Sequence, residues 1–191
     1  MLERKGAIAF ADLAPGIVAR AKIGDEEAFH LIFNRYGRPI LSFINNLVQD
    51  RDLAEDLTQE TFLKAFGHLQ SFQAGTNFRA WLFRIAHNSF LNQQRNGGGR
   101  RQPFPEQVAD EDEGPEQSAQ TRESLQLLAR AVAKLPMEFR AAFLLRVEEG
   151  LSFRQIADAL GLTEETARWR VFKARQKLMD VLAPQLEQEQ S

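Results

Sequence analysis

A polar segment at residues 96–120, NGGGRRQPFPEQVADEDEGPEQSAQ, limits what this chain can fold into because it cannot contribute to a hydrophobic core. It contains three consecutive glycines and three prolines, and few of its residues are apolar. Such a segment cannot bury enough apolar surface to offset the conformational entropy lost on ordering. We therefore expect a flexible linker over residues 96–121, with one folded lobe on each side of it.

The charge of the chain changes at the same segment. The net charge of −2 argues, taken alone, against a nucleic-acid-binding protein. However, residues 102–121 hold six acidic residues and no basic residue, whereas residues 1–101 hold 13 basic and 10 acidic residues. The low net charge of the whole chain is therefore due to the acidic block, because the first lobe is mildly basic and the second lobe is balanced. The net charge consequently does not exclude nucleic-acid binding.

Composition excludes several other classes of protein. The chain has no cysteine, so it has no disulfide framework and no thiolate nucleophile. Its histidines, His30, His68 and His87, do not have the spacing of metal ligands, and no glycine-rich phosphate loop is present. We predict no enzymatic activity, no metal and no cofactor. The chain has no apolar run of the ~20 residues that span a membrane, and we expect no signal peptide and a soluble, cytoplasmic protein.

Both lobes show the apolar periodicity of α-helices, and neither shows the sustained alternation of β-strands. In the first lobe, GRP (37–39) is expected to end one helix and Pro39 to begin the next. The fold class predicted is all-α, with two small helical domains joined by the acidic linker. The expected boundaries are an extension at 1–22, a first domain at 23–95, a second domain at 122–184 and a disordered tail at 185–191. The expected helices after residue 50 cover 51–69, 78–95, 122–134 and 137–149, followed by the pair described next.

The stretch LSFRQIADALGLTEETARWRVFKARQKL (151–178) predicts two helices joined by a tight turn. Ser152 and Thr163 are suited to cap the two helices, and Gly161 permits a left-handed turn between them. This is the pattern of a helix-turn-helix, whose second helix enters the major groove of DNA. The apolar residues expected to pack the two helices together are Ile156, Ala157, Leu160, Leu162, Ala167 and Val171.

The second helix of this pair is strongly basic. Residues 166–177 contain no acidic residue and five basic ones, Arg168, Arg170, Lys173, Arg175 and Lys177. Guanidinium groups bind phosphates and pair with the edge of guanine, so this helix is a candidate for reading duplex DNA. A surface helix with solvated charges is the weaker alternative. Trp169 either packs against a core or a partner, or touches a base edge.

A second candidate nucleic-acid site lies in SFQAGTNFRAWLFRIAHNSFLNQQR (71–95). Aromatic rings among cations and amides suit single-stranded nucleic acid, because bases stack on rings while cations follow the backbone. A helix that buries its aromatic residues and solvates its charges is the alternative, and periodicity alone favours it. The candidate residues are Phe72, Asn77, Phe78, Arg79, Trp81, Arg84, His87, Asn88, Asn92 and Arg95.

The two lobes together resemble the extracytoplasmic-function (ECF, group four) sigma factors of bacterial RNA polymerase, over residues 23 to 184. GDEEAFHLIFNRYGRPILSFINNLVQDRDLAEDLTQETFLKAF resembles the start of the sigma-two domain, and FRAWLFRIAHNSFLNQQR resembles its promoter-melting helix. LPMEFRAAFLLRVEEGLSFRQIADALGLTEETARWRVFKARQKL resembles the sigma-four domain.

This resemblance implies a transcription initiation factor that directs polymerase to promoters and helps to open them. Phe72 and Asn88 would help to hold an unstacked base of the minus-ten element, and the helix after residue 163 would read the minus-thirty-five element. The implied polymerase-binding residues are Asp52, Asp56, Gln59, Glu60, Phe62 and Leu63. The implied minus-thirty-five residues are Thr166, Arg168, Trp169, Arg170, Lys173 and Arg175.

The resemblance also implies partners. These are the core polymerase, through the clamp of its largest subunit and the flap of its second largest, promoter DNA, and an anti-sigma factor, with no membrane insertion. A stand-alone helix-turn-helix regulator, whose first lobe senses a ligand or dimerises, is the alternative function.

Overall fold

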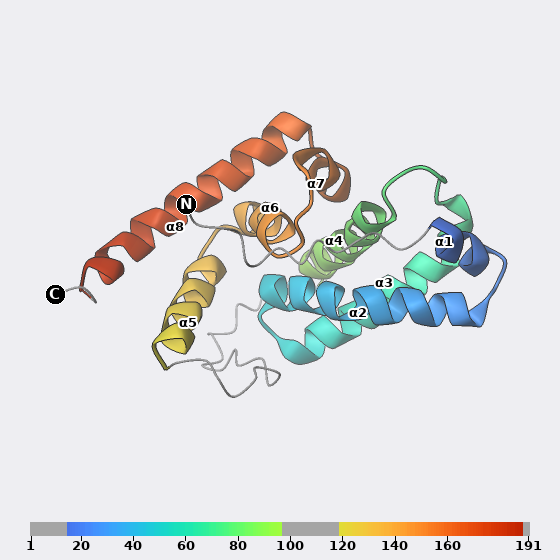
Figure 1. Cartoon of the computed structure of the whole chain (residues 1–191), viewed down its shortest axis with the longest axis horizontal. Helices are drawn as coiled ribbons and strands as arrows, with labels where there is room; N and C mark the ends of the chain where they lie inside the picture. Colours follow the sequence, from blue (N-terminus) through green and yellow to red (C-terminus); the bar gives the residue numbers. More distant parts are fainter. Residues whose placement is uncertain (1–14, 97–118, 189–191) are drawn as a thin grey trace.

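The computed structural model describes residues 15–96 and 119–188, which form α-helices, one 3₁₀ turn and no strand (Figure 1). The all-α prediction is therefore confirmed for the described residues. Most of the expected linker lies outside them, and the last three of its residues belong to a helix. The elements are α1 (Pro15–Lys22), α2 (Glu26–Val48), α3 (Arg51–Gly67), η1 (Leu69–Ser71), α4 (Phe78–Asn96), α5 (Ala119–Ala133), α6 (Met137–Val147), α7 (Phe153–Leu160) and α8 (Glu164–Gln188).

Helices α2, α3 and α4 form the core of the first lobe. Helix α2 is capped by Asp25, whose side chain accepts from the Ala28 backbone N–H at 3.2 Å. The Phe43 and Phe83 rings pack edge to face at the centre of the lobe, with centroids 5.3 Å apart. The fully or almost fully buried residues of α2 are Ala28, Ile32, Tyr36, Ile40, Phe43, Ile44 and Leu47.

Helix α2 runs through Pro39 without interruption, so the expected break at residues 37–39 is wrong. A proline inside a helix removes one backbone hydrogen bond and costs about 3 kcal/mol. Beyond it, Ile40, Phe43 and Ile44 are completely or almost completely buried, and each contributes about 1.5–3 kcal/mol by leaving water. Burial of a stripe that continues on both sides of Pro39 therefore outweighs the local cost.

Helix α1 comes from the segment 1–22, to which the sequence assigns no role. Its Val18 and Ala21 are buried against α2, and its last residue reaches the turn that follows α3. Residues 1–14 lie outside the described part of the chain.

The second lobe is built around α6, α7 and α8. Of the six apolar residues expected to pack the helix pair, five are buried and Leu162 is partly buried, so that prediction is confirmed. Helix α8 continues to Gln188, so residues 185–188 are helical where the sequence predicts a disordered tail. Gln, Leu and Glu are good helix formers, which explains the extension of α8 into polar sequence.

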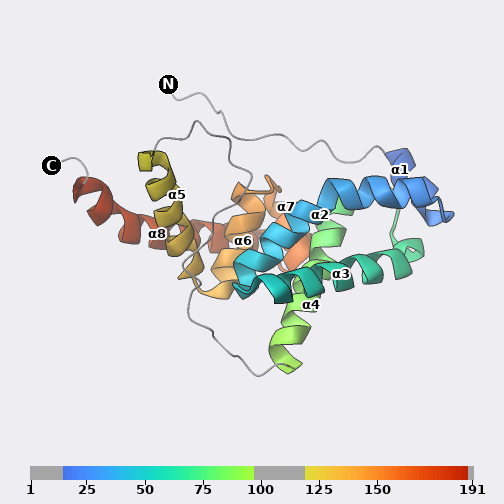
Figure 2. The same ribbon diagram turned by 90° about the horizontal axis from the view of Figure 1, so that it is seen from below.

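The two lobes pack against each other (Figures 1 and 2). Helices α6 and α7 lie between α8 and the first lobe, with α7 against α4 and α6 against the end of α2. One continuous cluster of buried apolar residues runs through both lobes. The face of α4 that meets α7 is consequently not available to another molecule in this arrangement.

Candidate nucleic-acid interface

Helix α7 begins at the predicted capping residue Ser152, and the turn between α7 and α8 contains the other two predicted residues, Gly161 and Thr163. The Ser152 hydroxyl accepts from the Gln155 N–H at 3.2 Å, while the Gln155 side chain accepts from the Ser152 N–H at 2.8 Å. Gly161 has a φ of 67°, the left-handed conformation that glycine adopts at least cost. Thr163 accepts from the Thr166 N–H at 3.2 Å. The Gly161 conformation and the Thr163 cap set the direction in which α8 leaves the turn.

The first turns of α8 present cations at the surface. Arg168 is exposed, forms an ion pair with Glu164 at 3.1 Å, and lies over the Phe153 ring at 4.9 Å. Both contacts pre-orient the guanidinium without burying it. Of the other expected minus-thirty-five residues, Arg175 is exposed, and Thr166, Arg170 and Lys173 are half-buried.

Trp169 both packs against its own lobe and remains partly exposed, so it fits each of the two roles that the sequence leaves open. Its ring packs edge to face on Phe139 of α6, with centroids 5.5 Å apart. Yet 49% of its surface remains exposed. One side of the indole therefore anchors α8 to the lobe, and the other side faces outward.

In the first lobe, the aromatic residues of 71–95 are mostly buried. Phe72, Phe78 and Trp81 form one cluster with centroid distances of 5.2–5.5 Å, and only Trp81 is half-exposed. Asn77 caps α4 by accepting from the Ala80 N–H at 2.7 Å. The interpretation that periodicity alone favours therefore holds for the buried rings of Phe72 and Phe78, but not for every polar residue of the segment, because Arg79 and His87 are also buried.

A polar stripe nevertheless runs along the outside of α4. Its residues follow the spacing of one helical face, and none of them is buried. We call it the α4 stripe, and it consists of Trp81, Arg84, Asn88, Asn92 and Arg95. Half of the expected minus-ten residues thus share one accessible face.

Two other expected minus-ten residues face the second lobe. Arg79 donates to the Glu149 carboxylate at 2.5 Å, and their side chains are only 7% and 6% exposed. His87 is also buried; burial, with a smaller contribution from the positive charge of Arg170, lowers its pKa from 6.5 to about 4. Both residues are part of the inter-lobe contact in this structure.

A basic residue of α6 that is not among the predicted site residues binds the end of α2. Arg140 of α6 donates to the Asn46 carbonyl oxygen at 3.1 Å and to that of Leu47 at 3.5 Å. These carbonyls belong to the last turn of α2, where the helix dipole favours a cation. Arg140 also donates to the carbonyl oxygens of Ala133 and Leu135 in its own lobe. No local signal identifies its contacts with α2, or the contact of Glu149 with Arg79, because those partners lie in the other lobe.

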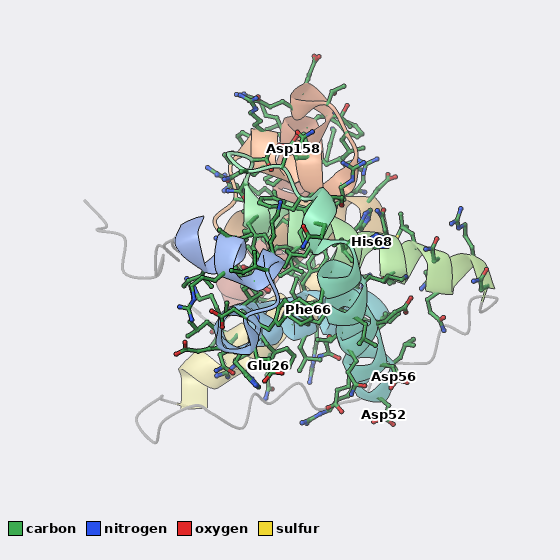
Figure 3. The ribbon with its side chains drawn as sticks, turned by 90° about the vertical axis from the view of Figure 1, so that its right-hand side faces the viewer. Glu26, Asp52, Asp56, Phe66, His68 and Asp158 are labelled. Atoms are coloured by element: carbon green, nitrogen blue, oxygen red, sulfur yellow. The ribbon has the colours of Figure 1, made fainter. Side chains whose placement is uncertain are left out.

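Helix α3 presents a different kind of surface. Asp52, Asp56, Gln59 and Leu63 are exposed on one face, and Leu63 is 74% exposed. We call this the α3 stripe, and Figure 3 shows Asp52 and Asp56 pointing away from the lobe. Glu60 pairs with Lys64. Phe62 is buried against Phe33 and Phe66 and supports the stripe from inside.

The described residues offer neither a metal site nor a membrane span. No group of three His, Asp or Glu side chains is placed to hold a metal ion. Among these residues there is also no helix with the length and apolar character needed to cross a membrane.

Comparison with known proteins identifies both lobes. Residues 32–100 match the family model of Sigma-70 region 2, and residues 125–178 match that of Sigma-70, region 4. The chain is 33% identical to the ECF RNA polymerase sigma-E factor of Salmonella typhimurium, over 88% of this chain and 93% of that protein.

Two solved structures have the same fold. CnrH in complex with the cytosolic domain of CnrY superposes with a TM-score of 0.69 and 26% identity, covering 89% of this chain and 97% of that chain. The sigma factor RpoE in complex with the anti-sigma factor NepR from Bartonella quintana gives a TM-score of 0.67 and 31% identity, covering 81% and 96%. Since both family regions occur in order and a relative matches nearly the whole chain, this chain belongs to the sigma-70 family and is an extracytoplasmic-function sigma factor, a promoter-directing subunit of bacterial RNA polymerase.

Proposed function

We propose that the α3 stripe docks this chain on the clamp of the largest polymerase subunit. An exposed leucine flanked by two carboxylates and an amide suits a protein partner with basic and apolar residues, because the apolar centre gives affinity and the charges give orientation. Leu63 is the apolar centre, since it is one of the most exposed large apolar residues of the first lobe. Region 4 makes the second polymerase contact, with the flap of the second largest subunit.

The exposed cations of α8 read the minus-thirty-five element as duplex DNA. The observation that carries this assignment is the capped turn at residues 161–163, which projects α8 with Arg168 already oriented and exposed. The matches to both sigma regions favour this initiation role over a stand-alone regulator.

The α4 stripe and the turn before it act on the minus-ten element. Asn88 and Arg84 are exposed and can meet the strand, with Trp81 beside them for stacking. Arg79 is buried against Glu149, so the lobes separate before the first turn of α4 meets DNA. Flipping a base costs a few kcal/mol, which a fitted pocket at the Phe72 cluster offsets.

An anti-sigma factor is a further partner in this proposal. Two solved relatives that cover most of this chain are described as complexes with CnrY and with the anti-sigma factor NepR. A cytoplasmic location follows from the same proposal, because polymerase and promoter DNA are found there.

The experiment that tests this function is co-elution of the full chain with core bacterial RNA polymerase on a sizing column, followed by binding to fork-junction promoter DNA. We expect the chain to join polymerase, and the complex to bind DNA that neither component binds specifically alone. Leu63→Asp should abolish co-elution. Ile23→Asp, which changes another exposed apolar residue of the same lobe, should leave it intact. Binding of duplex DNA by the free chain without polymerase would instead support a stand-alone regulator.

A further inference from the structure

Helix α1 ends against the turn that carries Phe72. The Lys22 ammonium donates to the Phe72 carbonyl oxygen at 2.5 Å and to that of Gln70 at 3.4 Å. The Gln70 side chain donates in return to the Lys22 carbonyl oxygen. The contact therefore has three hydrogen bonds between segments about fifty positions apart, which tie α1 to the turn.

The same ammonium also faces the ring of Phe72. It lies 5.8 Å from the ring centroid, within the range of cation–π attraction. The aromatic neighbours of that ring are Phe78, with ring centroids 5.2 Å apart, and Trp81, with ring centroids 5.3 Å apart. One cation thus contacts both the backbone and the ring of the residue on which the aromatic cluster is centred.

We propose that Lys22 is a positioning residue for minus-ten recognition, holding the turn at residues 69–72 so that Phe72 and Trp81 keep their relative placement. This proposal rests on the proposed function of that turn. It assigns a role to a segment that precedes the matched region 2, which begins at residue 32. Preorganisation of this kind lowers the cost of binding the unpaired strand.

Lys22→Met, which removes the charge but keeps most of the stem, tests the proposal. In complex with polymerase, we expect about a tenfold loss of affinity for a single-stranded minus-ten oligonucleotide, with polymerase binding unchanged. Lys22→Arg should recover most of this loss. Arg20→Met, which removes the α1 cation paired with Asp25 and Glu27, is the matched control and should bind the oligonucleotide like the parent.

A spectroscopic readout separates positioning from general stability. In a Trp169→Phe background Trp81 is the only tryptophan, so its emission reports on the Phe72 cluster in the free chain. We expect Lys22→Met, but not Arg20→Met, to shift that emission. Unchanged emission and unchanged oligonucleotide affinity would overturn the proposal. If the parent chain itself fails to join polymerase, the proposed function fails, while the emission of the free chain still tests the contact.

The inter-lobe ion pair supports a second, independent inference. Arg79 stands in the first turn of the proposed melting helix, and its guanidinium is bound by a carboxylate from the other lobe. A carboxylate and a DNA phosphate bind guanidinium in the same way. Together with the Arg140 contacts to α2, this pair joins the lobes through charge-assisted bonds that are partly or fully buried.

We infer that Glu149 is an internal competitor for the DNA backbone at Arg79, which keeps the free chain closed until polymerase or DNA separates the lobes. Removing one partner of a buried ion pair is strongly destabilising, whereas replacing both with apolar residues is often neutral. Glu149→Gln should therefore open the chain, and the double variant Arg79→Met/Glu149→Met should stay closed.

Energy transfer between labels on two introduced cysteines, Gln94→Cys and Glu165→Cys, measures this opening, since the chain has no cysteine of its own. We expect Glu149→Gln to lower the transfer and to raise the affinity of the free chain for single-stranded DNA about tenfold. Glu138→Gln, at an exposed position of α6, should change neither. Unchanged transfer in Glu149→Gln would refute the inference, as would a double variant that opens as much as the single one.

Discussion

Helices α4 and α8 carry the same kinds of residue, arginines and amides with a tryptophan, but they present them differently. Arg168 of α8 is exposed and oriented by Glu164 and Phe153. Arg79 of α4 is buried and neutralised by Glu149 of the other lobe. Similar sequence chemistry therefore gives one helix whose cations are exposed to solvent and one whose first turn is covered by the other lobe.

The largest expected effect comes from reversing the charge on the exposed helix. Arg168→Glu should lower promoter-specific transcription more than about a hundredfold, because it removes a contact worth about 1–3 kcal/mol and adds repulsion from phosphates. Run-off transcription measures this, and co-elution with polymerase should be unchanged. Lys134→Glu, the same charge change at an exposed site before α6, is the control. Loss of co-elution in Arg168→Glu would show that Arg168 serves folding or the polymerase contact instead.

The stability of the chain should depend on pH through the buried His87 of α4. His87 has an ordinary pKa of 6.5 in the unfolded chain and about 4 when buried, so the unfolded chain binds a proton more tightly between these values. The stability is fully present above pH 6.5 and falls as the pH drops toward 4, by about 2 kcal/mol at pH 5.

Urea unfolding of the parent and of His87→Gln at pH 8 and pH 5 isolates this effect, since all other titrating groups are shared. Between pH 8 and pH 5, the difference in unfolding free energy between the parent and His87→Gln should change by the amount due to His87 alone. An equal pH dependence of both proteins would show that His87 is not buried as neutral imidazole.

The contrast between the two helices also shows what the sequence can and cannot predict. The α7–α8 pair was predictable because Ser152 at the start of α7, and Gly161 and Thr163 in the turn, act on their immediate neighbours. The buried apolar set follows from helical periodicity. The uninterrupted α2 was not, since its continuity past Pro39 depends on burial against other helices. The Arg79–Glu149 pair joins residues 70 positions apart and leaves no local pattern at either one.

A smaller effect is expected on the outer face of α4. Asn88 is exposed on the α4 stripe, so Asn88→Ala should leave the core intact and slow promoter opening about tenfold, with little change in closed-complex affinity. Permanganate reactivity of unpaired thymines measures the opening step. Gln93→Ala, exposed on the same helix but outside the stripe, should open promoters at the parent rate. Full activity of Asn88→Ala on linear duplex DNA would remove Asn88 from the proposed base pocket.

The smallest effect tests whether α7, which packs against both α4 and α8, links the two helices. Ser152→Ala removes the N-cap of α7 and should lower the unfolding free energy by about 1 kcal/mol. Because α7 both covers α4 and supports α8, its loosening should raise amide hydrogen exchange in the first turn of α4 as well as in α8. Ser71→Ala, which removes a hydroxyl bonded to the His68 carbonyl in the turn after α3, is a control away from α7. If exchange rises only in α8, then α7 stabilises α8 alone. Protection of the first turn of α4 then depends on the Arg79–Glu149 pair rather than on the stability of α7.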